Sequence, residues 1–139
     1  MKDLVILGST GSIGRQSLEV AQKCGFKVSA LAAGSDIKLL EIQARKFLPE
    51  CVAVANEKAA KELKLRLKDT NIKVLSGQEG VLSAASDYGD TVISAIVGIA
   101  GLLPTLTAIN AGKTIALANK ETLVTAGKLV KAAAKEKNV

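Results

Sequence analysis

Apolar residues follow two patterns along this chain: short, largely apolar runs, and longer stretches in which apolar positions recur every three or four residues. A short apolar run bounded by polar or turn-forming residues is typical of a strand buried on both faces. Six runs predict strands, over residues 4–7, 28–33, 51–55, 72–75, 91–97 and 114–118, and those over 4–7, 28–33 and 91–97 are expected to be buried.

The stretches between these runs have the 3.6-residue period of amphipathic helices. They predict helices over 12–23, 37–48, 56–68, 77–86 and 119–135. A further helix is expected to have Pro104 in its first turn and to end at Gly112. Gly25 and Asn56 suit a C-terminal and an N-terminal cap. Because 64–68 also alternates like a strand, the end of the third helix stays open. Pro49 closes the second of these helices. The residues expected to face inward are, in the helix over 12–23, Ile13, Ser17, Val20 and Ala21; in that over 37–48, Ile37, Leu40, Ala44, Phe47 and Leu48; in that over 56–68, Ala60, Leu63 and Leu67; and in that over 119–135, Leu123, Ala126, Val130 and Ala133.

Strands that alternate with helices form βαβ crossovers, which bury a parallel sheet between two layers of helices. The expected fold is therefore α/β, a Rossmann-like doubly wound, mostly parallel sheet with helices on both faces, in one domain over residues 1–139. The helix expected over 119–135 is a crossover helix with no strand after it. Either the chain is a piece of a longer protein, or this helix simply docks on the sheet.

The junction between the first strand and the first helix contains Gly8, Gly11 and Gly14, spaced three residues apart. Gly8 permits a tight turn, Gly11 lets a ligand approach the backbone, and Gly14 lets the helix pack close to the sheet. Hydroxyl residues lie between the glycines, and the free N–H groups at a helix start attract anions. The loop predicts a pyrophosphate site; the alternative is a turn that serves packing only.

In folds of this kind, the residues of the loop after the second strand determine whether NAD or NADP binds. Here it reads Gly34-Ser35-Asp36. Gly34 and Ser35 leave room and a donor for the 2′-phosphate of NADP, whereas a carboxylate that faces the ribose favours NAD. Asp36 equally suits the N-cap of the next helix, so the residue types favour NADP only slightly.

A second polar cluster, Asn119-Lys120-Glu121, follows the last predicted strand. A lysine in the first turn of a helix lies at the positive end of the helix dipole, and an anionic substrate would compensate that charge. The alternative is that Lys120 points to solvent, at a cost of about a few tenths of a kcal/mol. For Glu121, simple support of the helix is the favoured interpretation.

Composition narrows the function classes. Aromatic residues are 2% of the chain, which argues against base-stacking surfaces for single-stranded nucleic acid, and nucleic-acid binding through basic helix faces is an alternative that no motif supports. The formal charge of +6 comes from basic residues spaced like solvated helix faces, and such a surface also steers anionic ligands. The excess lies mainly at Lys58, Lys61, Lys64, Arg66, Lys68, Lys128, Lys131, Lys135 and Lys137.

The chain has no histidine, and its two cysteines, Cys24 and Cys51, are far apart in sequence, which excludes a zinc site or a Cys–His nucleophile within it. Both thiols are expected to be buried and reduced in the cytosol. No apolar run is long enough to span a bilayer, and Met1 precedes the first strand too closely for a signal peptide. Because no triad or metal-spaced carboxylates occur, no catalytic residue and no metal ligand are expected in this chain.

The loop over 8–14, Gly-Ser-Thr-Gly-Ser-Ile-Gly, resembles the nucleotide loop of the 1-deoxy-D-xylulose 5-phosphate reductoisomerase family. Residues 95–125, which include Ala-Ile-Val-Gly-Ile-Ala-Gly-Leu-Leu-Pro-Thr-Leu and Ala-Asn-Lys-Glu-Thr-Leu-Val-Thr, are similar to that family's most characteristic segment. The likeness covers the whole chain without large gaps, and the two motifs at this separation are highly specific.

The resemblance implies residue roles by position. Lys120 matches a lysine that contacts the sugar-phosphate substrate. Many relatives have Asn in place of Asp36, which leaves the phosphate contact at that position open. The residues that match NADPH-contacting positions are Thr10, Gly11, Ser12, Ile13, Gly34, Ser35, Asp36, Asn119 and Glu121.

Enzymes of this family are NADP-dependent; they rearrange 1-deoxy-D-xylulose 5-phosphate and reduce the resulting aldehyde to 2-C-methyl-D-erythritol 4-phosphate, on the non-mevalonate route to isoprenoids. They use Mg²⁺ or Mn²⁺ as a Lewis acid, held by a later Asp-x-Glu motif, and are usually homodimers. The resemblance thus implies a cytoplasmic bacterial chain that binds NADPH without turning over substrate by itself, with no nucleic-acid or membrane partner. The alternative is a nucleotide-sensing regulatory module.

Overall fold

The structure, a computed structural model, describes residues 2–117 and residue 135. Its strands are β1 Asp3–Leu7, β2 Lys27–Ala33, β3 Cys51–Val54, β4 Lys73–Ser76, β5 Thr91–Ser94 and β6 Thr114–Leu117. Its helices are α1 Ser12–Cys24, α2 Ile37–Phe47, α3 Glu57–Arg66, α4 Gly77–Asp87 and α5 Leu102–Asn110, with a 3₁₀ turn, η1, over Ile99–Gly101. The strands form one sheet in the order β4-β3-β2-β1-β5-β6, and every neighbouring pair is parallel.

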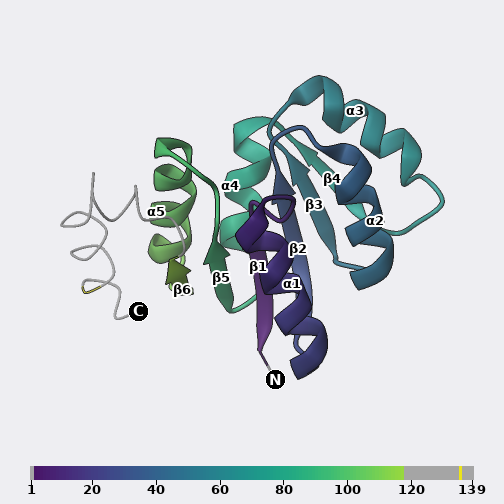
Figure 1. Cartoon of the computed structure of the whole chain (residues 1–139). Coiled ribbons are helices and arrows are strands. Elements are labelled where there is room, and N and C mark those ends of the chain that lie inside the picture. Colours follow the sequence, from purple (N-terminus) through teal and green to yellow (C-terminus); the bar gives the residue numbers. More distant parts are fainter. Residues whose placement is uncertain (1, 118–134, 136–139) are drawn as a thin grey trace.

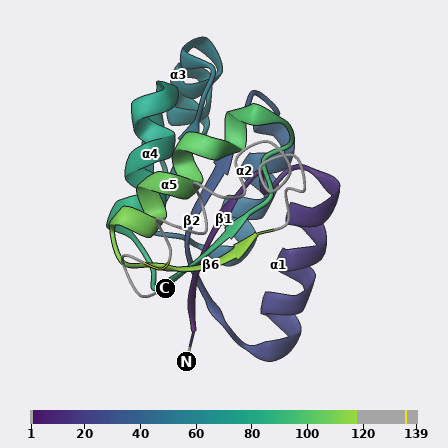
Figure 2. The same ribbon diagram turned by 90° about the vertical axis from the view of Figure 1, so that its left-hand side faces the viewer.

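Helices cover both faces of this sheet, which confirms the doubly wound prediction (Figure 1 and Figure 2). One apolar cluster joins α1, α2 and α3 to one face, through Leu18, Leu40 and Leu63. A second cluster joins α4 and α5 to the opposite face, through Ala84 and Ala108. The chain moves outward from β1 to β4 and then returns to β5 on the other side of β1, so right-handed crossovers place the two sets of helices on opposite faces.

The inward face of α1 differs from the prediction. Ala21 is buried as expected, and so is Gly14, but Ile13 and Val20 are 44% and 55% exposed. Ser17 is only half-buried. Gly14 lies against the turn that precedes the helix, and this contact rotates α1 so that the other three residues face sideways.

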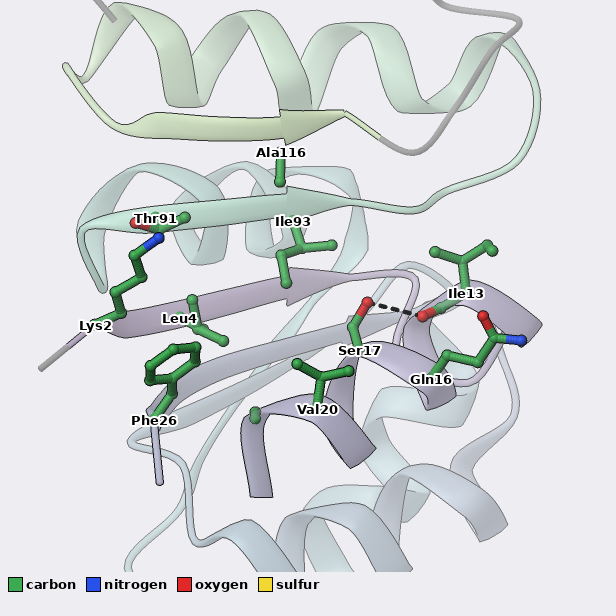
Figure 3. Close-up of a pocket in the computed structure, with 11 residues that line it drawn as sticks. Lys2, Leu4, Ile13, Gln16, Ser17, Val20, Phe26, Thr91, Ile93 and Ala116 are labelled. Atoms are coloured by element: carbon green, nitrogen blue, oxygen red, sulfur yellow. Dashed lines mark hydrogen bonds between the residues drawn. The ribbon is translucent and has the colours of Figure 1, made fainter. Parts of the chain in front are cut away.

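Those three side chains line a cavity of about 360 Å³ beside α1 (Figure 3). Leu4 of β1, Ile93 of β5 and Ala116 of β6 line the same cavity from the sheet. Because α4 and α5 pack on the opposite face, this side of β5 and β6 stays accessible to α1 side chains within the described part of the chain. Some apolar residues of α1 therefore face the core and others face this cavity, and helical periodicity alone does not distinguish the two groups.

The next two helices follow the sequence more closely. The Asn56 side chain accepts a hydrogen bond from the Ala59 N–H at 2.9 Å and caps α3, as predicted. This helix ends at Arg66, which makes the first part of the ambiguous 64–68 stretch helical. Leu48 was expected to face inward, but it is 70% exposed because the chain leaves α2 there in a left-handed conformation, with φ at 50°.

The fifth strand is shorter than predicted, since β5 ends at Ser94 and not at Val97. Ser94 pairs with Leu7, the last residue of β1, and the chain of β1 turns away at Gly8. Strand β5 therefore loses this neighbour beyond Ser94, and Val97 is 84% exposed. The predicted strand end at Ala118 and the helix over 119–135 lie outside the described residues.

The two cysteines differ, which corrects the expectation that both are buried: Cys24 is exposed and Cys51, in β3, is buried. Burial raises the pKa of the Cys51 thiol to about 11, although a hydrogen bond with Tyr88 opposes this change.

We expect one thiol to react with a disulfide reagent at neutral pH in the native protein and two in urea, with Cys24→Ser removing the native signal.

Since an unfolded thiol titrates near 9.0, the stability linked to Cys51 is complete below that pH and is lost as pH rises toward 11. Urea titrations at pH 8 and pH 10 measure that loss, and rapid reaction of both native thiols would contradict the burial of Cys51.

Candidate functional site

A cavity of about 570 Å³ opens at the carboxyl edge of the sheet. The strand order reverses there between β1 and β5, and parallel α/β sheets bind ligands at this point because the loops of the two neighbouring strands diverge. The lining residues come from the end of β2, from loops after four strands, from the turn η1 and from the first turns of α4 and α5: Gly8, Thr10, Gly11, Ala32, Ala33, Gly34, Ala55, Gln78, Val81, Ala95, Ile96, Val97, Ala100 and Pro104.

Backbone contacts fix the turn after β1. The N–H groups of Gly8 and Ser9 both donate to the Ala32 carbonyl, at 2.8 and 3.0 Å, so the turn is tied to the end of β2. Gly8 has a φ of 85°, and a Cβ there would lie 2.7 Å from the Ala95 carbonyl oxygen. Glycine is therefore required at this position both by its conformation and by the approach of the β5 loop.

The other two glycines of the motif differ from each other. A Cβ on Gly14 would lie 2.1 Å from the Gly8 carbonyl oxygen and 2.6 Å from the Ser9 Cα. The close packing predicted for Gly14 is thus directed at the turn rather than at the sheet. Gly11 has an ordinary φ of −79°, and the nearest atom to a Cβ there is the Gly8 carbonyl oxygen at 3.5 Å. The space beside Gly11 belongs to the cavity.

The start of α1 can bind an anion through its backbone. The N–H groups of Ser12, Ile13 and Gly14 have no carbonyl partner within the helix, and the helix dipole adds positive potential at this end. The first turn of α1 contains no acidic side chain that would compensate it. Since the described residues that line the cavity are all non-ionisable, only peptide dipoles and uncharged donors among them, such as the Thr10 hydroxyl and the Gln78 amide, could hold a phosphate there.

The loop after β2 forms another part of the wall. Gly34 lines the cavity with open space around its Cβ position, and its carbonyl accepts the Asn56 N–H at 2.9 Å. The Asp36 side chain accepts a hydrogen bond from the Leu39 N–H at 3.2 Å and caps α2. Of the two roles considered for this carboxylate, the helix cap is therefore the one seen in the structure.

The structure brings together Thr10, Gly11 and Gly34 at the cavity, which the sequence had proposed as cofactor residues from separate loops. Ser12 and Ile13 begin α1 beside it. The Ile13 side chain, however, points into the other cavity, with Ser17 and Val20 (Figure 3), so only its backbone can face a ligand at the carboxyl edge.

Ser35 and Asp36 are exposed next to Gly34. The remaining candidates, Asn119, Lys120 and Glu121, lie outside the residues that the structure describes.

The sequence analysis missed the far wall of the cavity, formed by Ala55, Gln78 and the first residues after β5. This wall is rigid at one end, because the Thr105 hydroxyl donates to the Gly101 carbonyl at 2.7 Å and accepts from Ser94 at 2.7 Å. One rule would have found these residues: in a parallel sheet, the residues just after each strand reach the same edge.

Within the described ranges, no three His, Cys, Asp or Glu side chains are grouped as metal ligands, so we assign no metal-dependent step to them. None of the helices in this part of the chain combines the length and apolar character that crossing a bilayer requires.

A family model described as 1-deoxy-D-xylulose 5-phosphate reductoisomerase matches residues 4–127. The chain belongs to this reductoisomerase family. The reductoisomerase of Ruminiclostridium cellulolyticum is 53% identical over an alignment of 139 positions, which covers 99% of this chain and 36% of the relative. That of Agathobacter rectalis is 50% identical over an alignment of 141 positions, which covers 100% of this chain and 37% of the relative.

Solved reductoisomerases have the same fold. One from Zymomonas mobilis in complex with NADPH superposes with a TM-score of 0.93 at 35% identity, over 99% of this chain and 37% of that one. A reductoisomerase in complex with NADPH, fosmidomycin and magnesium gives a TM-score of 0.93 at 40% identity, over 99% of this chain and 35% of that one. The chain therefore spans little more than a third of the length of these reductoisomerases.

Proposed function

We propose that residues 1–139 form the NADPH-binding domain of a 1-deoxy-D-xylulose 5-phosphate reductoisomerase. The main support is the cavity at the carboxyl edge, because one space is lined both by Thr10 and Gly11 just before α1 and by Gly34 after β2. In this proposal the pyrophosphate lies against the N–H groups that begin α1, with Ser12 and Ile13 contributing through their backbone. The adenosine 2′-phosphate lies beside residues 34–36.

The same proposal covers the whole protein. In this proposal, the whole protein isomerises 1-deoxy-D-xylulose 5-phosphate and reduces the product to 2-C-methyl-D-erythritol 4-phosphate for isoprenoid biosynthesis by the non-mevalonate route. NADPH supplies the hydride when bound. Asn119 and Glu121 contact the cofactor, Lys120 contacts the sugar-phosphate substrate, and Mg²⁺ or Mn²⁺ binds residues beyond 139. A cytoplasmic location and a homodimer of the whole protein belong to the proposal as well.

The 139-residue chain by itself is proposed to bind NADPH without turning over substrate. Reduction of a carbonyl needs a group that polarises or protonates it. The described residues that line the cavity are Gly, Ala, Val, Ile, Pro, Thr and Gln, and none of these side chains transfers a proton near neutral pH. The cavity therefore supports binding and orientation of the cofactor.

Calorimetric titration of the chain with NADPH and with NADH tests the binding, and an assay with 1-deoxy-D-xylulose 5-phosphate and Mg²⁺ tests the absence of turnover. We expect one saturable site that prefers NADPH, and no oxidation of NADPH above the rate without protein. A folded chain that binds neither nucleotide would refute the proposed function, whereas measurable turnover would refute only the inactivity of the chain.

Asp36 allows a sharper test of the 2′-phosphate position. Asp36→Asn keeps an oxygen that can accept from the Leu39 N–H but removes a negative charge near the proposed phosphate. We expect NADPH to bind roughly three- to tenfold more tightly, because the variant no longer repels the 2′-phosphate at a site that solvent partly screens. The affinity for NADH should be unchanged.

Asp36→Ala serves as the matched control, because it removes the same charge together with the cap and should cost about 1 kcal/mol of stability. Parallel titrations and thermal melts separate the two effects. An unchanged preference for NADPH over NADH in both variants would place the 2′-phosphate away from this loop.

A further inference from the structure

Gln43 is a buried polar residue that the proposed function leaves without a role. It lies on the inner side of α2, 6% exposed, and its Nε2 donates to the Ser9 carbonyl at 2.8 Å. Its Oε1 and the Ser9 hydroxyl are also buried, and neither has a hydrogen-bond partner among the described residues. An apolar side chain would avoid the cost of burying the unpaired amide oxygen, so packing alone does not account for glutamine here.

The hydrogen bond from Gln43 fixes the orientation of one peptide group in the loop. The Ser9 carbonyl and the Thr10 N–H belong to the same peptide, which is trans. In a planar trans peptide the C=O and N–H bonds point in opposite directions. Because Gln43 holds the carbonyl on the α2 side, the Thr10 N–H points away from α2, and Thr10 lines the cavity at the carboxyl edge.

We propose that Gln43 is a positioning residue, which holds the Ser9 carbonyl inward and thereby directs the Thr10 N–H at the pyrophosphate of the dinucleotide. This inference rests on the proposed function. Rotation of the same peptide by half a turn would present a carbonyl oxygen to the phosphate in place of a donor. Gln43 prevents that arrangement, so the peptide is ready for the anion before it binds.

The residues around Gln43 are suited to this role because α2 is firmly held. Leu40 and Ala44, on either side of Gln43, are fully buried. Arg45 donates to the Asp69 carboxylate at 3.0 Å and to the Arg66 carbonyl at 2.9 Å, which ties α2 to the end of α3. The loop is held at its other end by the two hydrogen bonds to the Ala32 carbonyl. Between that end and α1, the Ser9–Thr10 peptide accepts its hydrogen bond from a side chain of α2.

The test compares two ligands and three variants. Gln43→Met keeps the length of the side chain but has no donor, and we expect its affinity for NADPH to be roughly three- to tenfold lower. Adenosine 2′-monophosphate, which has no pyrophosphate, should bind the parent chain and this variant equally. Gln22→Met, at an exposed position of α1, controls for the substitution, and Leu63→Val, in α3, controls for a general loss of stability.

A second measurement needs no variant. In ¹H–¹⁵N spectra of the parent chain, NADPH should move the Thr10 amide proton strongly downfield, as expected for a new bond to an anionic oxygen. A Thr10 amide that does not move overturns the inference. So does a Gln43→Met variant that binds NADPH like the parent, or one that loses both ligands to the extent that Leu63→Val does. If the parent itself binds no NADPH, the proposed function fails and this inference fails with it.

Discussion

Gly14→Ala is expected to lower the free energy of unfolding by about 3 kcal/mol or more, the range of severe overpacking. The added methyl would lie 2.1 Å from the Gly8 carbonyl oxygen and 2.6 Å from the Ser9 Cα. Both atoms belong to the backbone, so no side-chain rotation relieves the contact. To accommodate the methyl, either α1 moves away from the turn or the turn gives up its hydrogen bonds to the Ala32 carbonyl. Urea unfolding followed by circular dichroism measures the loss.

Gly34→Ala is the matched control for this stability measurement. It makes the same chemical change at a glycine of the loop after β2, where a Cβ meets nothing within 4 Å. We expect its free energy of unfolding to stay within about 0.5 kcal/mol of the parent value. If Gly14→Ala were equally harmless, the close approach of α1 to the turn would be wrong.

Gly11→Leu is expected to fold and to weaken NADPH binding by a factor of about 100 or more, the size of effect that a blocked subsite produces. The backbone at Gly11 has φ −79° and ψ 175°, which any residue adopts, and its Cβ would be in ordinary contact at 3.5 Å. Leucine at an N-cap costs about 1 kcal/mol, so the chain stays folded. The side chain, however, extends into the space where the pyrophosphate is proposed to bind.

A graded series makes this second prediction sharper. From Gly11→Ala through Gly11→Val to Gly11→Leu, the NADPH affinity measured by calorimetry should fall with side-chain size while the thermal midpoint changes little. The two glycines, three residues apart in one motif, thus have opposite expected outcomes: loss of stability at Gly14 and loss of binding at Gly11. Undiminished NADPH binding by Gly11→Leu would show that the pyrophosphate does not lie at the start of α1.

Much of the site could be predicted because it depends on local backbone requirements. Gly8 turns the chain directly after a strand that the apolar run over 4–7 already indicates, and Asn56 caps a helix through an atom three residues away. Such features need only the neighbouring sequence. The alternation of strands and helices likewise leaves few arrangements, since right-handed crossovers restrict a parallel sheet.

The errors share a different cause. Apolar residues at helical spacing predicted that Ile13 and Val20 face the core, but the contact of Gly14 with the turn decides how α1 is rotated. Val97 belongs to an apolar run that reads as a strand, yet β5 ends where its neighbour β1 turns away at Gly8. In each case the deciding contact is with another element or with a neighbouring strand.

The sequence by itself determined the order of elements, the buried central strands and the glycine turn that precedes α1, because short-range sterics and hydrophobic periodicity specify all three. Tertiary structure alone decided which loops meet at the cavity and that Gln43 of α2 supports the Ser9 carbonyl. Those facts depend on the distance between segments far apart in the chain. That distance is set by how the helices pack on the sheet, and no local pattern records it.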